Sequence, residues 1–407
     1  MRSDRTKVVH IFYSTLPSAK GGDIRSRDVV ESQAEVGVDV LAVSSPFQPP
    51  AVPGESVEQF GGVSYYRTYS ESDGLHISEK DQGLGVKLKK LGKIIPFVRY
   101  IRDLCAREKP DVIHAHSTFF CAAAAYFGGR RQGIPYVYEV RSLWEERSVM
   151  KSPTLKNKLV AKAAKTAETL AMRSADHLIV ISEGLKHEAL RRGVPEGKIT
   201  IIGNAANLTR IPAVEPTYRS KRPSEWVFGY IGNLSDIEGL DLLIDAVRVL
   251  REKGWLNPVH IYGGGPAQAD LVSRAAQIDG VVFKGAFKPE DARSIYAEVD
   301  IVVNPRRRSA LTDKVTPLKP LEAMAYRKPV VVSSVAGMLE LVREGETGFV
   351  FEADDQQALA DVLIRVTAAG AALDDVVSKA YAYVLENRSW RANGLKYQAL
   401  YSTLRRA

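Results

Sequence analysis

The chain has 407 residues, of which 45% are hydrophobic and 26% charged, a composition typical of a soluble globular protein with room for two domains. Its net charge is +8, which permits a phosphorylated substrate, an anionic membrane or nucleic acid as a partner. No zinc-finger, helix-turn-helix or aromatic-interleaved basic motif occurs in the sequence, so we expect no nucleic acid partner.

Targeting and redox signals are also absent from the sequence. No apolar run approaches the ~20 residues that span a membrane, and the first apolar run, VVHIFY, is too short for a signal peptide. Cys105 and Cys121 are the only cysteines and lack the spacing that binds zinc. These features predict a reduced, cytoplasmic protein.

Strands and helices alternate through the first half of the chain. Apolar runs predict strands at 8–13, 38–43, 63–67, 112–114, 136–140 and 178–181, and helical spacing predicts helices at 23–36, 97–108, 118–131 and 154–173. Residues 46–62 are predicted as a loop. Strands separated by helices imply right-handed crossovers, so the pattern predicts an α/β, doubly wound parallel sheet.

The same pattern restarts after a stretch rich in Asn, Pro and Ser at 201–225, which is typical of a linker. Strands are predicted at 226–230, 260–262, 281–284, 301–303, 330–332 and 349–351. Helices are predicted at 239–253, 267–278, 289–298, 318–326, 338–343, 355–368 and 389–404. A second α/β domain follows from this repetition.

One stretch of the second half, residues 315–351, holds a pair of charges at helical spacing. Thr316 is a plausible cap and Pro317 suits a first helical turn. Lys319 would then lie in the first turn, with Glu322 on the same face one turn deeper. Such a pair is usually a solvated helix face, but a lysine at a helix N-terminus also suits a phosphate.

The whole segment resembles a known signature. The run PLKPLEAMA at 317–325, then KPVVVSS, Glu340 and a glycine turn, resembles the donor site of retaining glycosyltransferases of family 4 (glycosyl transferases group 1). The resemblance extends over most of the chain and implies the GT-B architecture, two Rossmann-like domains facing a cleft. It implies an acceptor domain at 1–205 joined by a returning C-terminal helix at 387–407, a linker at 206–225 and a donor domain at 226–386.

In the first domain, Gly21 and Gly22 follow the first strand, where an ordinary turn is the simpler explanation. The family places such glycines against the donor diphosphate, and Arg25 would reach the same anion. His116 ends a strand and is either a structural group or an acceptor contact. Arg141 stands where many relatives have a histidine near the reacting sugar; it cannot act as a base but could hold a phosphate or carboxylate.

The second domain departs from the family in three positions. Asn233 and Glu238 stand where relatives carry cations for the diphosphate, and Lys314 replaces a glutamate eight residues before Glu322. A dense run of charge at Arg306–Arg308 is usually a solvated loop. Because it coincides with the lost cations, we expect this loop to supply the diphosphate clamp.

The resemblance implies transfer of a sugar from a nucleotide-diphosphate sugar to a glycan, lipid-linked or small-molecule acceptor, without a metal or other cofactor. The sequence is similar in detail to a subgroup of the family associated with bacterial exopolysaccharide clusters. Glu322 would hold the ribose hydroxyls and Lys319 the diphosphate. The predicted catalytic residues are His116, Arg141, Lys319 and Glu322. The predicted nucleotide-sugar contacts are Gly21, Gly22, Arg25, Gly232, Gly264, Arg306, Leu318, Lys319, Glu322 and Glu340.

Two other functions fit the same sequence. A GT-B sugar-nucleotide epimerase would use the same cleft and would turn over without an acceptor. A non-catalytic GT-B binding protein is suggested by the departures at Asn233, Glu238 and Lys314.

A basic segment at 83–102, GLGVKLKKLGKIIPFVRYIR, holds lysines and arginines among apolar residues and no acidic residue. It is either a surface segment packed on the first domain or a peripheral contact with an anionic membrane. Contact with an anionic membrane would place the protein at the inner face of the membrane.

Overall fold

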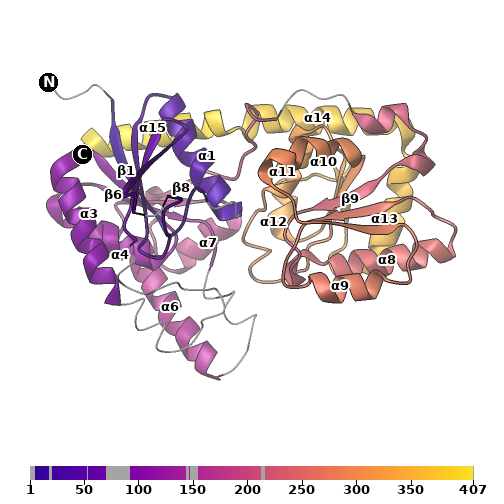
Figure 1. Ribbon diagram of the computed structural model, residues 1–407, viewed down its shortest axis with the longest axis horizontal. Helices are drawn as coiled ribbons and strands as arrows, with labels where there is room; N and C mark the ends of the chain where they lie inside the picture. The colour runs from indigo at the N-terminus through magenta and orange to yellow at the C-terminus, as the bar shows by residue number, and fades with distance from the viewer. Residues whose placement is uncertain are drawn as a thin grey trace. The chain divides into compact units, whose positions relative to one another are not determined.

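The computed structural model describes residues 5–17, 21–52, 54–69, 92–143, 146, 155–211 and 216–406. The chain forms two compact units, and Figure 1 traces both. The first unit comprises residues 1–203 and 390–407, and the second comprises residues 204–389.

The first unit is built on an eight-stranded sheet in the order β3-β4-β2-β1-β5-β6-β7-β8. Among its described strands, β3 and β4 pair antiparallel and the others pair parallel. Its strands are β1 (Lys7–Phe12), β2 (Asp39–Ser44), β3 (Val57–Phe60), β4 (Val63–Arg67), β5 (Val112–His116), β6 (Tyr136–Val140), β7 (His177–Val180) and β8 (Ile199–Ile201). Its described helices are α1 (Gly21–Glu35), α3 (Ile94–Glu108), α4 (Phe119–Gly128), α6 (Leu155–Ser174), α7 (Glu183–Arg191) and α15 (Trp390–Arg406).

Strand β3 lies inside the stretch 46–62 that the sequence predicts as a loop, so that prediction is wrong in part. The side chain that β3 buries is Glu58, while Val57 is exposed. The strand therefore lacks the apolar alternation by which a half-buried strand is found in a sequence.

Helix α15 returns to the first unit after the second unit is complete, and it lies beside α1 (Figure 1). Asn393 donates to the carbonyl of Gly203 over 2.9 Å, and Gln398 donates to the carbonyl of Val36 over 2.6 Å. A Cβ at Gly394 would stand 2.3 Å from the backbone oxygen of Ser32. The glycine thus permits close approach of the two helices.

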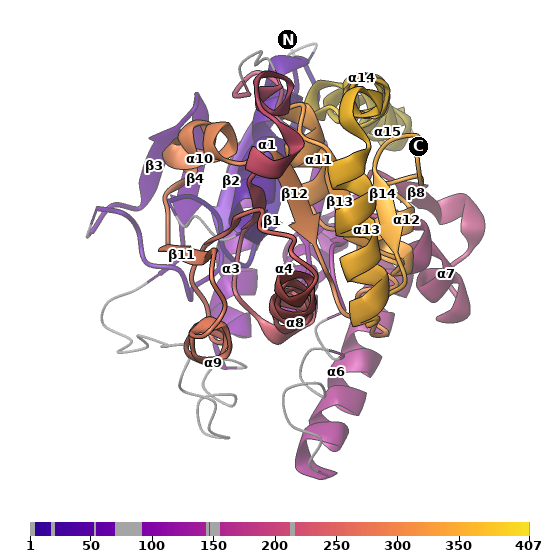
Figure 2. The ribbon, with the colours of Figure 1, turned by 90° about the vertical axis from the view of Figure 1, so that its right-hand side faces the viewer.

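Helix α6 extends beyond the sheet of the first unit in both views (Figures 1 and 2). Its side chains of Leu159 and Leu170 are exposed. None of the helices within the described ranges is long and apolar enough to cross a membrane.

The second unit is built on a six-stranded, entirely parallel sheet in the order β11-β10-β9-β12-β13-β14. Its strands are β9 (Phe228–Ile231), β10 (Val259–Tyr262), β11 (Val281–Gly285), β12 (Ile301–Asn304), β13 (Val330–Ser333) and β14 (Phe349–Phe351). Its helices are α8 (Leu240–Glu252), α9 (Gln268–Ala275), α10 (Ala292–Glu298), α11 (Lys319–Ala325), α12 (Ala336–Leu339), α13 (Gln356–Ala368) and α14 (Leu373–Asn387). The strand order reverses between β9 and β12, which is where doubly wound sheets bind ligands at their carboxyl ends.

Both faces of the second sheet are buried. Helices α8 and α9 lie on one side of β9 and helices α10 and α11 on the other (Figure 1). Ile301 and Val303 of β12 belong to one apolar cluster, while Val302 belongs to the other with Met324 of α11. The continuous apolar runs of the sequence follow from this double burial.

The start of α11 differs from the sequence prediction. The helix begins at Lys319, and its N-cap is Leu318, which makes no side-chain cap. Thr316 therefore does not cap the helix; its carbonyl accepts a hydrogen bond from Asn204 over 2.7 Å. The proline in the first turn is Pro320, not Pro317.

The stretch predicted as a linker at 206–225 belongs to the second unit in the part that the structure describes. Tyr218 is buried in the apolar core with Trp226, whose Nε1 donates to the carbonyl of Tyr218 over 3.0 Å. Ala206 forms an isolated parallel bridge with Ser389.

We expect Gly394→Ala to destabilise the first unit, because the added Cβ meets the backbone oxygen of Ser32 and overpacking costs about 1–3 kcal/mol. Thermal unfolding measures the change. Gly197→Ala is the matched control, since a Cβ there meets nothing within 4 Å. Equal melting temperatures for both variants would contradict the close packing of α15 on α1.

Candidate functional site

A buried carboxylate lies near the carboxyl edge of the first sheet. Glu139 in β6 has no exposed surface. Its Oε1 accepts from Arg141 Nε over 2.7 Å and from Arg25 Nη2 over 3.2 Å, and its Oε2 accepts from the Tyr397 hydroxyl over 2.5 Å. One carboxylate therefore joins β6, α1 and α15.

The charge state of Glu139 follows from these partners. Burial alone would raise the pKa of its carboxyl, but the guanidinium groups of Arg141 and Arg25 outweigh burial and hold this pKa well below its usual range. The group is an anion at neutral pH, and its charge is balanced inside the unit.

Arg141 links three elements of the first unit. Its Nη1 donates to the Ser26 hydroxyl over 2.8 Å and to the Gly22 carbonyl over 3.4 Å, and its Nη2 donates to His116 Nδ1 over 2.7 Å. The carboxylate that the sequence predicts for Arg141 to hold is thus Glu139 of the same chain. Each guanidinium nitrogen already has a partner.

His116 is 1% exposed and belongs to a buried row of imidazoles. Its Nδ1 accepts from Arg141, so its Nε2 carries the proton and donates to His10 Nδ1 over 2.9 Å. His10 Nε2 in turn donates to Gln33 Oε1 over 3.0 Å. Burial lowers the pKa of His116 well below its usual value, and Arg141 lowers it further. Burial likewise lowers the pKa of His10 to about 3.

His10, His114 and His116 have ligand nitrogens within 4.8 Å of one another, a grouping that would suit a metal ion. The hydrogen bonds argue against that use. His116 Nε2 is a donor because Arg141 occupies Nδ1, so this nitrogen offers a metal no lone pair. The third histidine is held by the Tyr401 hydroxyl, 2.6 Å from its Nδ1.

The glycines Gly21 and Gly22 are the first two residues of α1. A Cβ at Gly22 would meet nothing within 4 Å, so space lies open beside it. The first turn also carries Asp23, which is 5% exposed and accepts a hydrogen bond from Ser14. This negatively charged carboxylate would repel an anion bound at the start of α1.

Arg25 does not reach that position. Its side chain is 3% exposed, stacks 5.0 Å from the ring of Trp390 and donates to the carbonyls of Ile202 and Gly203 as well as to Glu139. The sequence predicts a contact with the donor anion, whereas the structure uses this arginine to bind α15 and β6. A pair of partners so distant in sequence leaves no local signal.

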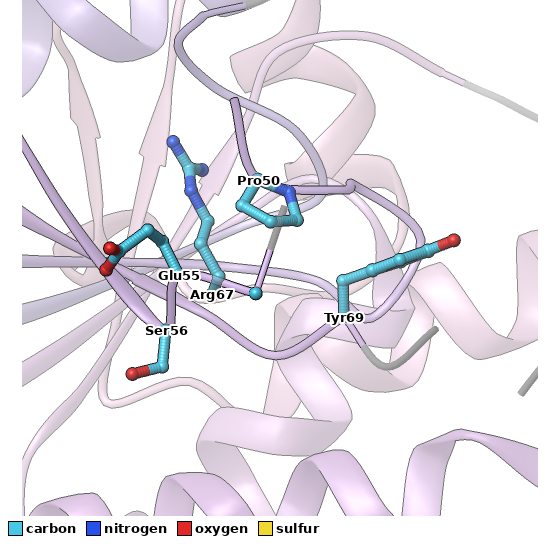
Figure 3. A pocket seen from close by; sticks show the side chains of 6 residues that line it. Pro50, Glu55, Ser56, Arg67 and Tyr69 are labelled. Atoms are coloured by element: carbon cyan, nitrogen blue, oxygen red, sulfur yellow. The ribbon is translucent and has the colours of Figure 1, made fainter. Parts of the chain in front are cut away.

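A small hollow opens beside the end of β4, with a volume of about 240 Å³. Its lining residues are Gly54 and five that Figure 3 labels: Pro50, Glu55, Ser56, Arg67 and Tyr69. It is smaller than the ~300–1,000 Å³ of typical ligand pockets. Arg67 is already paired with Glu58 at 2.5 Å, so the hollow offers no uncompensated cation.

In the second unit, the loops after β9 and β10 touch through their backbones. Gly232 has φ +152 and Gly263 has φ +138, and a Cβ at Gly263 would stand 1.8 Å from the carbonyl oxygen of Gly232. Gly264 accepts a hydrogen bond from the Leu234 amide over 3.0 Å. The glycines are required for this close approach at the point where the strand order reverses.

Lys319 lies in a fixed setting beside these loops. Its Nζ is 2.8 Å from Glu238 Oε2, donates to the Tyr230 hydroxyl over 2.5 Å and stands 4.6 Å from the centre of that ring. A Cβ at Gly232 would meet Lys319 Cε at 2.4 Å, so the glycine makes room for the lysine stem. The residue that departs from the family at 238 is therefore the partner of Lys319.

Burial lowers the pKa of Lys319, while the carboxylate of Glu238 opposes that fall. Helix α11 has seven residues, too short for its dipole alone to attract an anion strongly. The positive charge at this end of the sheet comes from side chains.

The arginine loop, residues Arg306–Arg308, contains two kinds of residue. Arg307 pairs with Asp241 and with Asp354, and Arg308 pairs with Glu352 at 3.1 Å. Both side chains are thus occupied by carboxylates.

Arg306 differs from its neighbours. It is 5% exposed, its Nη1 donates to the Val315 carbonyl over 3.2 Å, and its Nε has no hydrogen-bond partner. Within the described part of the chain it pairs with no carboxylate. The nearby carboxamide of Asn304, 1% exposed, likewise has no partner at either polar atom.

The two remaining predicted glutamates of the second unit lie at different helices. Glu322 lies one turn beyond Lys319 in α11, near enough to support the protonated form of that lysine. Glu340 ends α12, where its Oε1 is 3.8 Å from Arg388 Nη2. The structure groups Gly232, Lys319 and Arg306 with Glu238 and Tyr230, two residues for which the sequence predicts no binding role.

Two Rossmann-like units define a GT-B protein, and comparisons with known proteins agree. Residues 20–205 match the family model described as "Glycosyl transferase 4-like domain", and residues 225–369 match "Glycosyl transferases group 1". These matches together cover more than half of the chain. The chain belongs to glycosyltransferase family 4.

The capsular polysaccharide biosynthesis glycosyltransferase CapM of Staphylococcus aureus is 26% identical over 49% of this chain and 54% of its own length. The amylovoran biosynthesis glycosyltransferase AmsK of Erwinia amylovora is 30% identical over 51% of each chain. The matched segment thus spans about half the length of these two relatives. The structure of Anabaena HepE in complex with UDP-glucose superposes with a TM-score of 0.70 at 17% identity, covering 98% of this chain and 100% of that chain.

We expect the first unit to lose stability as the pH falls below about 6.5. The histidines His10, His114 and His116 are neutral when folded but take up protons in the unfolded chain, so stability rises with pH in this range. Between pH 7.5 and 5.5 each imidazole contributes on the order of 1 kcal/mol. Hydrogen exchange of the β5 and β6 amides reports on this unit. Protection that stays constant over this range would contradict neutral, buried imidazoles.

Proposed function

We propose that the chain is a retaining glycosyltransferase that moves a sugar from a nucleotide-diphosphate sugar to a glycan or lipid-linked acceptor in bacterial polysaccharide synthesis. Membership of family 4 supports the reaction class. The names of CapM and AmsK, which refer to capsular polysaccharide and amylovoran, support the pathway class. The reaction proceeds without a metal.

The observation that carries the proposal is the buried guanidinium of Arg306. A buried cation without a carboxylate partner is costly, and an anionic ligand would reduce that cost. Arg306 follows β12, beside the point where the strand order reverses, and its charge lowers the pKa of Lys319. A diphosphate bound here would meet two cations.

Each residue then has a role. Arg306 and Lys319 hold the diphosphate and stabilise the charge that develops on it as it leaves. Glu322 accepts hydrogen bonds from the ribose hydroxyls. The UDP-glucose bound to HepE supports a uridine nucleotide as the first donor to test.

The first unit holds the acceptor in this proposal, and His116 and Arg141 act there as support. Arg141 is bound both to Glu139 and to His116 inside the unit. His116 and Arg141 therefore fix the ends of β5 and β6 and do not touch the reacting sugar.

An epimerase is less compatible with these positions. It needs an acid or base at the sugar, and His116, which the sequence offers for that role, is buried and neutral. Incubation with UDP-glucose alone separates the two reactions. We expect no change in the sugar without an acceptor, whereas turnover of the nucleotide sugar alone would favour the epimerase.

We expect Arg306→Gln to weaken binding of UDP about 10- to 100-fold, because charge-assisted hydrogen bonds contribute roughly 1.5–3 kcal/mol. Isothermal calorimetry measures this. Thermal stability without ligand should change little, since the variant removes a buried charge that has no carboxylate partner but also removes the hydrogen bond to the Val315 carbonyl.

Arg308→Gln is the matched control, because that side chain is already paired with Glu352. Its affinity for UDP should stay within about threefold of the wild type. Similar losses in both variants, or none in Arg306→Gln, would remove Arg306 from the donor site.

We further propose that the basic segment at 83–102 contacts an anionic membrane. Residues 83–91 lie outside the described ranges. In α3, Ile95 is 61% exposed, and Arg99 and Arg102 are exposed at helical spacing from it. An exposed apolar side chain beside cations suits the surface of an anionic bilayer.

We expect co-sedimentation with vesicles that contain phosphatidylglycerol and not with neutral vesicles at low salt, since each basic residue near the surface contributes about 1 kcal/mol. Changing four lysines of the segment to Gln should release the protein: Lys87, Lys89, Lys90 and Lys93.

The matched control removes the same charge from exposed residues of the second unit: Lys253, Lys288, Arg343 and Lys379. This variant should sediment as the wild type does. Wild-type protein that stays in the supernatant, or equal release of both variants, would exclude attachment through this segment.

A further inference from the structure

We propose that Glu238 is a positioning residue for the donor, which holds the ammonium of Lys319 in place and in its charged form. The inference rests on the proposed function, since it assigns to Lys319 a diphosphate ligand. The sequence predicts no binding role for Glu238. It shows only that a glutamate stands where relatives carry a cation for the diphosphate.

The contacts of Lys319 leave its ammonium little freedom. The Glu238 carboxylate lies 2.8 Å away and the Tyr230 hydroxyl 2.5 Å away. The Tyr230 hydroxyl in turn donates to the Asn233 carbonyl over 2.7 Å, so its lone pairs face the lysine. An ammonium has three N–H donors, and these two contacts use two of them.

Glu238 is itself held rigidly. It ends a short 3-10 turn at Asp236–Glu238 and is 9% exposed. Gly239 follows with φ +68, and a Cβ there would meet the Pro305 carbonyl oxygen at 2.0 Å. The turn that carries the carboxylate is thus packed directly against the start of the arginine loop.

The charged groups that face Lys319 come from four elements. Glu238, and Glu322 in the same helix as Lys319, favour the charged ammonium, while Arg306 disfavours it. Tyr230 offers a neutral hydroxyl and ring. Glu238 is the carboxylate in direct contact. Without it, burial and the charge of Arg306 would both favour the neutral amine of Lys319.

The test is calorimetric titration of UDP, GDP, ADP and dTDP into the full chain between pH 7 and 10. The variants are Glu238→Gln, Glu238→Asp, Lys319→Ala and the double variant Glu238→Gln with Lys319→Ala. Glu252→Gln, an exposed carboxylate at the end of α8, is the control. Circular dichroism confirms that each variant is folded.

We expect Glu238→Gln to bind the preferred nucleotide about tenfold more weakly than wild type at pH 8, and to lose affinity at a lower pH on alkaline titration. Glu238→Asp should recover part of the affinity. In the Lys319→Ala background, the same change at 238 should alter affinity by less than about twofold, because it acts through the lysine.

Three results would overturn the inference. Binding by Glu238→Gln equal to wild type with an unchanged pH profile would make the ion pair structural only. Tighter binding would make Glu238 a repelling charge. An equal effect of the change with and without Lys319 would show that it does not act through this lysine. Wild type that binds none of the four nucleotides would instead reject the proposed function itself, and the inference with it.

Discussion

The first unit depends on compensating one buried negative charge. Glu139 lies near the carboxyl end of β6 with no access to water, where an unpaired carboxylate would cost several kcal/mol. The fold brings two guanidinium groups and a tyrosine hydroxyl to it. Once Arg141 is bound to Glu139, its Nη2 donates to His116 Nδ1. This hydrogen bond fixes the tautomer of His116, and His116 in turn fixes that of His10.

The second unit handles charge in the opposite way. Most of its arginine loop is neutralised by carboxylates, yet the guanidinium of Arg306, which enters the interior, pairs with no carboxylate among the described residues. A buried cation that lacks a carboxylate partner while its neighbours are paired is a favourable place for an anion to bind. The position of that cation at the end of β12 is the one that the strand order favours for a ligand.

Much of this architecture follows from local patterns. The apolar runs at 136–140 and 349–351 predict strands that the structure reproduces residue for residue, because strands buried on both faces need no alternation. The class, two Rossmann-like domains of family 4, was also predictable from the order of motifs in the sequence.

The roles of individual side chains were less predictable. Tyr397 lies 258 residues from Glu139 in the chain, and Glu238 pairs with a lysine 81 positions later. No spacing rule connects such pairs. A local pattern shows Arg25 and His116 as polar residues at strand and helix ends, but whether they face a ligand or the interior depends on partners that arrive from elsewhere. The sequence therefore shows where polar side chains stand along the chain, but not which partners they contact.

Helix α15 makes the second unit, in chain order, an insertion within the first. During synthesis the strand that carries Glu139 leaves the ribosome long before the tyrosine that satisfies it. The nascent first unit must therefore wait, with one hydrogen-bonding site of a buried carboxylate open and one helical face of α1 uncovered, while 186 residues of the second unit are made. A helix translated after the whole second unit therefore completes the first.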